Sequence, residues 1–444
     1  MKSLMKRIFL INIFLFFSFD SFQCKFLENK ALTREEEGKI IATITTDDES
    51  ALRQATFYLW KLGGIIYIDT PVINFKNEGS ISITGTIEGG IIGKKQPNGK
   101  YPRLNFKEQR DSTTTFYQSG INVVGSNKVI KNLIVENAGT FGIFVSGQKN
   151  TIDHVITRYN GQSGIFVSSD SDSNTFNYIY SYRNFHFDEN NLIADGFTVE
   201  IGGINNIFNN CFAWENSQNG FGYYHFNGLH KNGALTYTHS ASWNNGNIDV
   251  FSGKYDFDNG KDLDKNMWTI QQIIKSDENF ENNYNNKIFN LEDVIINTKP
   301  ANDYFSEYSK EDEGNGFNFG NERNEPSLIN RRTVDYCVSF DHKSKGFNSN
   351  KSQNFTGLFS NSVSFNNNMN YDLPYSFVKW NNNWGWNSNE DDHFDLEVIV
   401  RKPSNMASAK KDFYSIRDQI IKAVYDNRIP EDINFDKVIK GLSE

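Results

Sequence analysis

One unit recurs along the middle of this 444-residue chain, between Gly142 and Gly346. Each copy has a short apolar tract, a polar link rich in Asn, a small or polar residue, Gly, and then an aromatic or aliphatic residue. Copies read NLIVENAGTFGIFV, DHVITRYNGQSGIFV, NCFAWENSQNGFGYY and DYCVSFDHKSKGFNS. A unit of this size cannot bury its apolar face alone, but a stack of such units can. The repeat therefore predicts an all-β chain folded as a parallel β-solenoid.

In such a solenoid each turn, or rung, stacks on the next at about 4.8 Å, so equivalent residues form ladders. Val, Ile, Leu and Phe would form the inner ladders, and Asn would stack at the turns, where it tolerates left-handed backbone. An AT-rich genome is the other explanation for the Asn excess. An antiparallel β-sandwich is the alternative fold, because short irregular strands suit it as well.

The two ends of the chain differ from the middle. The capping-box pattern Thr46-Asp47-Asp48-Glu49 leads into an amphipathic helix over 51–62, which Gly63 ends. Residues 410–428 have helical apolar spacing and would pack across the last rung or along the side of the stack. We expect a signal peptide at 1–24, an N-terminal cap and first strands at 25–115, the β-helix at 116–400 with a loop insertion at 253–312, and a C-terminal helical segment at 401–444.

The N-terminus predicts secretion. Lys2, Lys6 and Arg7 precede an apolar run over 8–19 that is too short to span a bilayer, which is typical of a signal peptide. An uncleaved anchor is the alternative. Cys211 and Cys337 each lie nine residues before a Gly of the repeat, which places them about three rungs apart and too far for a disulfide. Both are predicted to be buried free thiols.

The charge balance excludes one class of partner. The formal net charge is −9, whereas a nucleic-acid binder needs clustered Lys and Arg to neutralise phosphates. Beyond the N-terminus no stretch has the roughly 20 apolar residues that cross a bilayer. We therefore expect no nucleic-acid partner, no membrane span, and a monomer.

A series of phrases in this sequence resembles a known enzyme family. In order they are ADGFTV, NNIFNNCFAWENSQNGF, WNNG, GNGFNFG and SKGFNSN, spread over residues 120–375. The series is similar to the pectate lyases of polysaccharide lyase family nine, which are right-handed parallel β-helices. The resemblance implies a secreted enzyme that cleaves homogalacturonan by Ca²⁺-assisted β-elimination. Such chemistry needs a cation on the uronate carboxylate and a base beside the ring carbon.

Carried over position by position, the family site is incomplete. The first calcium ligand of the family matches Asp195, but the DDGWD phrase that supplies three more carboxylates reads QNGFG over 218–222. The family base, a Lys in NGFKLGG, is matched by Asn318, which cannot take up a proton. Asp195 is thus the one retained metal position, and Ca²⁺ follows only from the resemblance.

Stacking the repeats predicts two polar columns over this site. Residues one before the motif Gly form the first, Asp195, Asn219, Asn315 and Lys345; residues two after it form the second, Thr198, Gly222, Asn318 and Asn348. We take Asn219, Asn315, Lys345 and Asn348 as candidate substrate-binding residues. A relocated base is also conceivable, with Lys254, Lys345, Arg331 and Arg332 as the nearest cations.

Three functions fit these residues. The first is a divergent lyase of pectate or a related uronate-rich cell-wall polysaccharide, with a shifted base. The second is an inactive solenoid that binds the same polysaccharide, and the third is a structural or adhesive surface protein. The loss of the carboxylates and of the Lys favours the second over a standard lyase. Other patterns are weaker: Asp256 to Asp264 misses the register of a calcium loop, and His225, His230 and His239 lack metal-ligand spacing.

Overall fold

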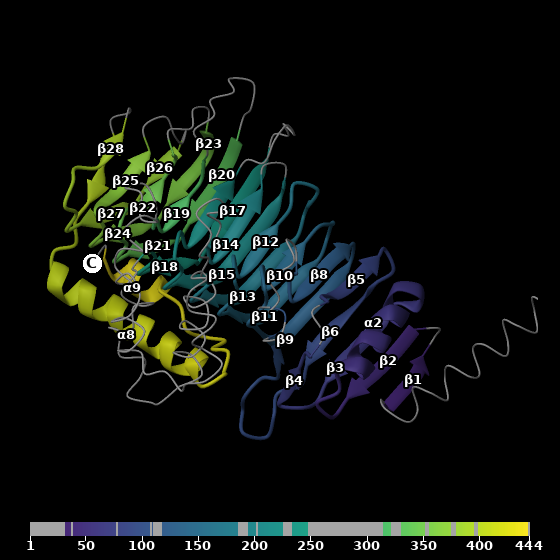
Figure 1. The fold of residues 1–444 in the computed structure, drawn as a ribbon. Helices are drawn as coiled ribbons and strands as arrows, with labels where there is room; N and C mark the ends of the chain where they lie inside the picture. Colours follow the sequence, from purple (N-terminus) through teal and green to yellow (C-terminus); the bar gives the residue numbers. More distant parts are fainter. Residues whose placement is uncertain are drawn as a thin grey trace, which may run out of the picture.

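The computed structural model describes residues 32–36, 39–76, 79–106, 109, 118–184, 194–200, 203–224, 233–246, 314–320, 330–350, 355–373, 379–394 and 398–442. The expected signal peptide and the insertion at 253–312 lie outside these residues. Within them the chain winds into a long stack of rungs with helices at one end and along one side (Figure 1).

Two sheets run the length of the stack, one of 19 strands and one of 10. The larger sheet contains β1 (Leu32–Glu36), β2 (Lys39–Ile44), β3 (Gly64–Ile68), β4 (Val72–Asn74), β6 (Gly89–Gly93), β7 (Arg103–Asn105), β9 (Lys128–Glu136), β11 (Thr151–Arg158), β13 (Thr175–Tyr182), β15 (Asn206–Trp214), β17 (Ala234–Thr238), β18 (Ala241–Trp243), β20 (Asn330–Asp335), β21 (Val338–Phe340), β23 (Phe355–Ser360), β24 (Val363–Phe365), β26 (Lys379–Asn381), β27 (Asn383–Trp386) and β29 (Val400–Arg401).

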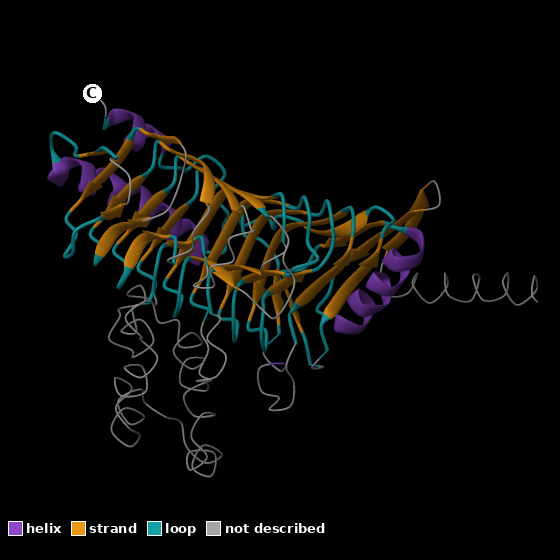
Figure 2. Ribbon diagram, turned by 90° about the horizontal axis from the view of Figure 1, so that it is seen from above, coloured by secondary structure: helices purple, strands orange, loops and turns teal. Residues whose placement is uncertain are grey.

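The smaller sheet contains β5 (Ile81–Gly85), β8 (Ile121–Gly125), β10 (Ile143–Val145), β12 (Ile165–Val167), β14 (Phe197–Glu200), β16 (Phe221–Tyr224), β19 (Phe317–Asn318), β22 (Lys345–Asn348), β25 (Met369–Leu373) and β28 (His393–Phe394). Its strands pair in parallel throughout, and in the larger sheet only β1 and β2 pair antiparallel among the described strands. Viewed from above, the two sheets enclose a flattened tube (Figure 2). The parallel β-helix predicted by the repeat is confirmed, and the β-sandwich is not found.

The core is built from ladders of like residues. Phe197 lies opposite Phe221, and Phe221 opposite Phe317, with ring centroids 4.6 and 4.4 Å apart and almost parallel planes. All three rings are 1% exposed or less, and burying each contributes about 1.5–3 kcal/mol. The repeat of aromatic residues in the sequence is therefore the repeat of the core.

Asn ladders close the turns between the two sheets. In the longest one, each side-chain oxygen accepts the backbone N–H of the rung before it; Asn184, for example, accepts from Asn160 and its own N–H donates to Asn216. The ladder residues are buried: Asn160, Asn184, Asn216, Asn245, His342 and Asn367. Without such acceptors the buried turn N–H groups would be unsatisfied.

His342 takes one place in this ladder although its residue type differs. Its Nδ1 accepts the N–H of Asn245 at 3.3 Å, and its Nε2 therefore carries the proton and donates to the carbonyl of Ser242 at 3.0 Å. Burial lowers the pKa of His342 from 6.5 to about 3. The ladder thus holds this imidazole in one neutral form.

The helix α2 (Glu49–Leu62) covers the first rungs, as predicted. Its N-cap is Asp48, whose carboxylate accepts the N–H of Ala51 at 2.9 Å, instead of the Thr46 that the capping box indicated. Parallel pairing already begins with β2 and β3, so the stack starts well before residue 116, where we expected the β-helix to begin.

The C-terminal segment forms α8 (Met406–Tyr425) and α9 (Asp436–Gly441). Of the two positions expected for it, the structure shows the side of the stack, where α8 lies in Figure 1. The apolar face of α8, including Phe413 and Ile420, packs in a second core cluster with Trp214 and Trp386.

Cys211 and Cys337 are buried and free, as predicted. Their strands β15 and β20–β21 are separated only by β17–β18, so they lie two rungs apart instead of three. At about 4.8 Å per rung this still exceeds the reach of a disulfide.

The Asn184→Ala variant tests the ladder. It removes the acceptor for the buried N–H of Asn160, and we expect a loss of about 1–3 kcal/mol in the free energy of unfolding. Asn122→Ala on β8, outside the ladders, should change it far less. Denaturant unfolding of both variants checks this, and equal losses would contradict a role for the ladder.

A second test uses His342. Between pH 6.5 and about 3 the unfolded chain binds a proton at this residue that the folded chain does not, so stability falls as the pH is lowered through that window. His342→Asn keeps an acceptor in the ladder and removes the titration. We expect its loss of stability from pH 7 to pH 5 to be smaller than that of the parent by about 2 kcal/mol; identical pH profiles would contradict the assignment.

Candidate functional site

The first predicted column exists and is itself a hydrogen-bonded ladder. The carboxylate Oδ1 of Asp195 accepts the backbone N–H and the side-chain amide of Asn219, at 2.9 and 3.1 Å. Asn219 in turn accepts both groups of Asn315, at 3.0 and 2.9 Å, and Asn315 accepts the N–H of Lys345 at 3.1 Å. The structure thus brings these four residues together in the register that the sequence predicted.

The first three residues of this ladder are almost completely buried. Asp195 and Asn315 are 0% exposed, and Asn219 is 2% exposed. Their oxygens satisfy the backbone of the next rung, as in the Asn160 ladder. We therefore assign Asn219 and Asn315 a direct role in supporting the turns, and their contact with a substrate stays a prediction.

The carboxylate of Asp195 also fills the space that a side chain at position 222 would need. Its Oδ2 accepts the Oγ1 hydroxyl of Thr198 at 2.9 Å, and a Cβ placed on Gly222 would lie only 2.0 Å from this oxygen. Gly222 is the position where the resemblance places a calcium carboxylate. The Asp195 carboxylate and a side chain at position 222 are thus mutually exclusive in the observed arrangement.

The second predicted column is also confirmed, and it is longer than predicted. Thr198 pairs with Gly222 and Asn318 with Asn348, and the register continues to Asp372 and then to His393. Asn318 and Asn348 are 7% and 1% exposed. Their Oδ1 atoms accept nearby backbone N–H groups, from Gly320 at 3.4 Å and from Asn350 at 2.7 Å.

The two columns meet in a polar cluster around Asp372 on the last rungs. Lys345 Nζ lies 2.8 Å from Asp372 Oδ2, and His393 Nδ1 lies 3.1 Å from Asp372 Oδ1. Lys345 and Asp372 are largely buried, while the His393 side chain is 58% exposed. The sequence did not reveal this carboxylate partner, because Asn370 replaces the Gly of the repeat in that rung.

The residues present do not fit a calcium ion at the family position. Asp195 is the one carboxylate in the first column, and both its oxygens already accept hydrogen bonds. Calcium requires six to eight oxygen ligands, commonly several carboxylates. Within the part of the chain that the structure describes, no group of three His, Cys, Asp or Glu side chains could hold a metal ion.

The candidate replacement bases lie in different environments. Lys345 is paired with Asp372, as described above. Arg332 points into the solenoid, where its guanidinium lies 4.6 Å from the ring centroid of Tyr223 and donates to the carbonyl of Gly233. Arg331 is exposed on β20, in the larger sheet. Lys254 lies outside the described residues. Of the three described cations, Lys345 is held by Asp372 and the two arginines stay protonated, so none of them is suited to act as the base.

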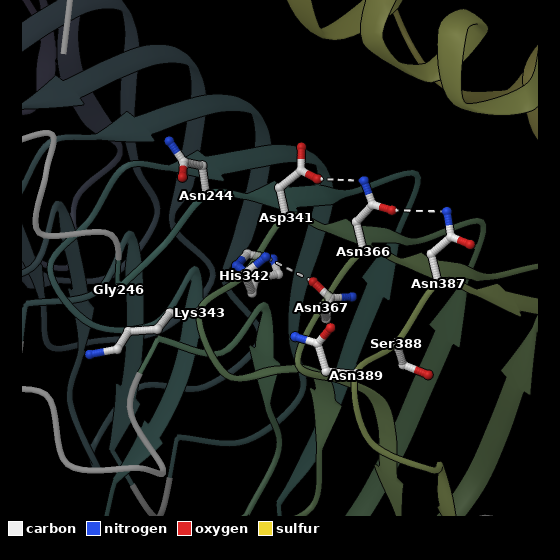
Figure 3. A pocket seen from close by; sticks show the side chains of 10 residues that line it. All are labelled: Asn244, Gly246, Asp341, His342, Lys343, Asn366, Asn367, Asn387, Ser388 and Asn389. Atoms are coloured by element: carbon white, nitrogen blue, oxygen red, sulfur yellow. Dashed lines mark hydrogen bonds between the residues drawn. The ribbon is translucent and has the colours of Figure 1, made fainter. Parts of the chain in front are cut away.

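An open pocket lies at the turns that lead into β22, β25 and β28 (Figure 3). It has a volume of about 730 Å³ and is lined mainly by amides. Asn387 donates to Asn366 at 3.3 Å, and Asn366 donates to Asp341 at 3.0 Å, which forms a ladder across three rungs. The lining residues are Asn244, Gly246, Asp341, His342, Lys343, Asn366, Asn367, Asn387, Ser388 and Asn389.

The pocket adjoins the first column. A Cβ on Gly246 would lie 2.5 Å from the Cα of Gly314, which directly precedes Asn315, and Lys343 is two residues before Lys345. Sequence reasoning missed this pocket. The available signal was the run of Asn after each strand of the last rungs, at 366–368 and at 387 and 389.

A stack of phenylalanines continues the second column in the opposite direction. The rings of Phe144 and Phe166 lie 5.7 Å apart, and Phe141 stacks on Phe166 at 4.3 Å. Phe144 and Phe166 occupy the positions of Thr198 in the two preceding rungs. The outer face of the smaller sheet therefore changes from aromatic to amide along its length.

The remaining candidates are structural or undescribed. The Nδ1 of His239 forms a hydrogen bond with Oδ1 of Asp436 in α9 at 2.8 Å, and this hydrogen bond raises the pKa of His239. It thus anchors the C-terminal segment. His225, His230 and the acidic stretch 256–264 lie outside the described residues. No described helix is long and apolar enough to cross a membrane.

A double-mutant cycle can test the steric overlap between the Asp195 carboxylate and a side chain at position 222. Gly222→Ala should destabilise the fold by about 1–3 kcal/mol, because the added methyl overlaps the carboxylate. In an Asp195→Ala background the same change should cost markedly less. Urea unfolding of the four proteins measures the coupling; additive effects would contradict the close contact.

Comparison with known proteins completes the description. Residues 37–262 match the family described as "Pel9A-like, right handed beta helix region", which is 226 of 444 residues. No curated protein matches the sequence. Similar solved structures include "Crystal structure of pectate lyase Pel9A" (18% identity, TM-score 0.48, covering 77% of this chain and 70% of that chain) and "Geobacillus virus E2 - ORF18" (10% identity, TM-score 0.42, covering 85% and 69%). The chain belongs to the family of Pel9A-like right-handed β-helix proteins.

Proposed function

We propose that this protein is a secreted polysaccharide-binding β-helix that recognises uronate-rich cell-wall polysaccharide, such as pectate, without cleaving it by the calcium-assisted route. Membership of the Pel9A-like family supports a carbohydrate-related function. The finer proposal rests on the amide-lined pocket beside the first column.

This pocket has the chemistry that sugar hydroxyls need. An amide side chain both donates and accepts, and Asn387, Ser388 and Asn389 are exposed at its edge. Its volume of about 730 Å³ is within the range of ligand pockets, roughly 300–1,000 Å³. Successive rungs repeat at about 4.8 Å, so the pocket presents amides at regular intervals along the stack.

Charge limits the mode of binding. The protein carries a net charge of −9, so its overall field repels a polyanion. Lys343 at the pocket and Lys345 beside it supply local positive charge, although Asp372 balances Lys345. We therefore expect moderate affinity that rests on hydroxyl hydrogen bonds and on Lys343.

The same residues argue against elimination. β-Elimination needs a group that accepts the proton next to the uronate carboxylate, and the amide at Asn318 cannot do so. It also needs the developing charge to be neutralised, and the column around Asp195 does not fit a calcium ion. The described residues thus offer binding groups and lack both parts of the catalytic apparatus.

The test measures binding and cleavage in one set of samples. Purified mature protein is incubated with polygalacturonate with and without Ca²⁺; affinity electrophoresis reports binding, and ultraviolet absorbance reports the unsaturated product. We expect binding that does not require Ca²⁺, and no product. We also expect no product from Asn318→Lys, because a base alone does not restore the missing carboxylates.

A matched pair of variants locates the binding site. Lys343→Gln at the pocket should weaken binding about two- to fivefold, the size of an exposed charge contact. Lys379→Gln, an exposed lysine on β26 of the larger sheet, should leave it unchanged. Product formation by the unmodified chain would establish a lyase with another base, and absence of binding would leave a structural or adhesive role.

A further inference from the structure

The short helix α9 is held against the side of the stack by apolar packing and by a contact that can titrate. Phe435, the residue before α9, is 2% exposed, and its ring centroid lies 6.3 Å from those of Trp243 and Phe340. In the first turn of α9, Oδ1 of Asp436 forms the hydrogen bond with Nδ1 of His239 at 2.8 Å. The helix therefore covers part of the second core cluster, and a histidine of the stack lies beside it.

The fold fixes the position of this histidine. His239 lies at the turn between β17 and β18 with left-handed backbone (φ 50°), and its N–H donates to the carbonyl of Asp335 at 3.0 Å. Its ring stacks on that of Tyr336 in the next rung, with centroids 5.3 Å apart and planes 16° apart. The side chains of His239 and Asp436 are 33% and 19% exposed. The imidazole is thus held in place but can still exchange its proton with water.

The charges around His239 favour its protonated form. The hydrogen bond to Asp436 has the largest effect on the pKa of His239, and the negative charges of Asp436 and Asp335 act in the same direction. Partial burial and the ammonium of Lys440 in α9 oppose them, and the net effect is a raised pKa. Because this pKa is higher in the folded chain, the contact stabilises α9 most below about pH 6.5 and weakens as the pH rises through the folded value.

Two neighbouring contacts of the C-terminal segment involve tyrosines that stay protonated in this range. Tyr180 donates to the carbonyl of Pro430 at 2.7 Å, and Tyr101 donates to Glu431 at 3.4 Å. Burial raises the pKa of both tyrosines above the ordinary value of 10. These tyrosines therefore hold the chain before α9 at neutral pH as well as in mild acid.

We propose that His239 and Asp436 form a pH-sensitive latch, which holds α9 over Trp243 and Phe340 in mild acid and loosens it as the pH rises. The loosening is a local opening of α9, and the stack remains folded. Its direction is opposite to the effect of His342, whose burial destabilises the whole fold as the pH falls. The latch does not depend on the function proposed for the amide-lined pocket.

Hydrogen exchange of the full-length protein tests the latch. The backbone amides of 436–442 are compared at pH 5.5 and pH 7.5, each as a protection factor relative to the intrinsic exchange rate at that pH. We expect protection about two- to fivefold higher at pH 5.5, the size of one partly exposed charged contact. Amides of β11 and β13, which lie away from the latch in the stack, should not become more protected at pH 5.5.

Matched variants identify the titrating pair. His239→Gln keeps a donor for Asp436 and removes the titration, so α9 should be protected equally at both pH values. Asp436→Asn should likewise lose most of the pH effect. His393→Gln removes another His–Asp contact, the one between β28 and β25, and should keep the effect.

Three results would overturn the proposal. The first is equal protection of α9 at both pH values in the parent protein, and the second is protection that rises with pH. The third is a pH dependence in His239→Gln that equals that of the parent.

Discussion

In this solenoid each rung stacks in parallel on the next, and this stacking determines where the buried polar and aromatic side chains can lie. It forces each buried turn N–H to find an acceptor one rung away, and Asn side chains meet that need in the ladder from Asn160 to Asn367. The same stacking aligns Phe197, Phe221 and Phe317 in the core. The side chain at any position of a rung therefore limits which side chains can fit at the equivalent positions of the two neighbouring rungs.

This coupling explains how the family site is changed. At position 219, where the resemblance places a calcium carboxylate, Asn219 accepts the N–H of Asn315 and so continues the hydrogen bonds that start at Asp195. The carboxylate lies over Gly222 and against Thr198, where a further side chain would overlap it. With an amide at position 219, this part of the column is a closed ladder of hydrogen bonds.

Much of the fold could be predicted from the sequence, because Gly, Asn and Phe recur once in each rung and their spacing therefore gives the length of a rung. Both site columns followed from it in the correct register. The pairing of Lys345 with Asp372 did not, because both columns were counted from the repeat Gly, and Asn370 replaces that Gly in the next rung. His342 was missed for a similar reason, since a His took the place of an Asn. The packing of α8 against the side of the stack joins residues far apart in sequence, and no local pattern reports such contacts.

We propose that this chain retains the family fold but binds polysaccharide through amides instead of cleaving it with the help of a metal ion. A crystal structure of the protein with Ca²⁺ and an oligogalacturonate tests it most directly. We expect sugar residues against the amides of Asn366, Asn387 and Asn389, with the Asp195–Asn219–Asn315 ladder intact and no calcium ion at Asp195. A calcium ion coordinated by Asp195, with the uronate carboxylate bound to that ion, would contradict it.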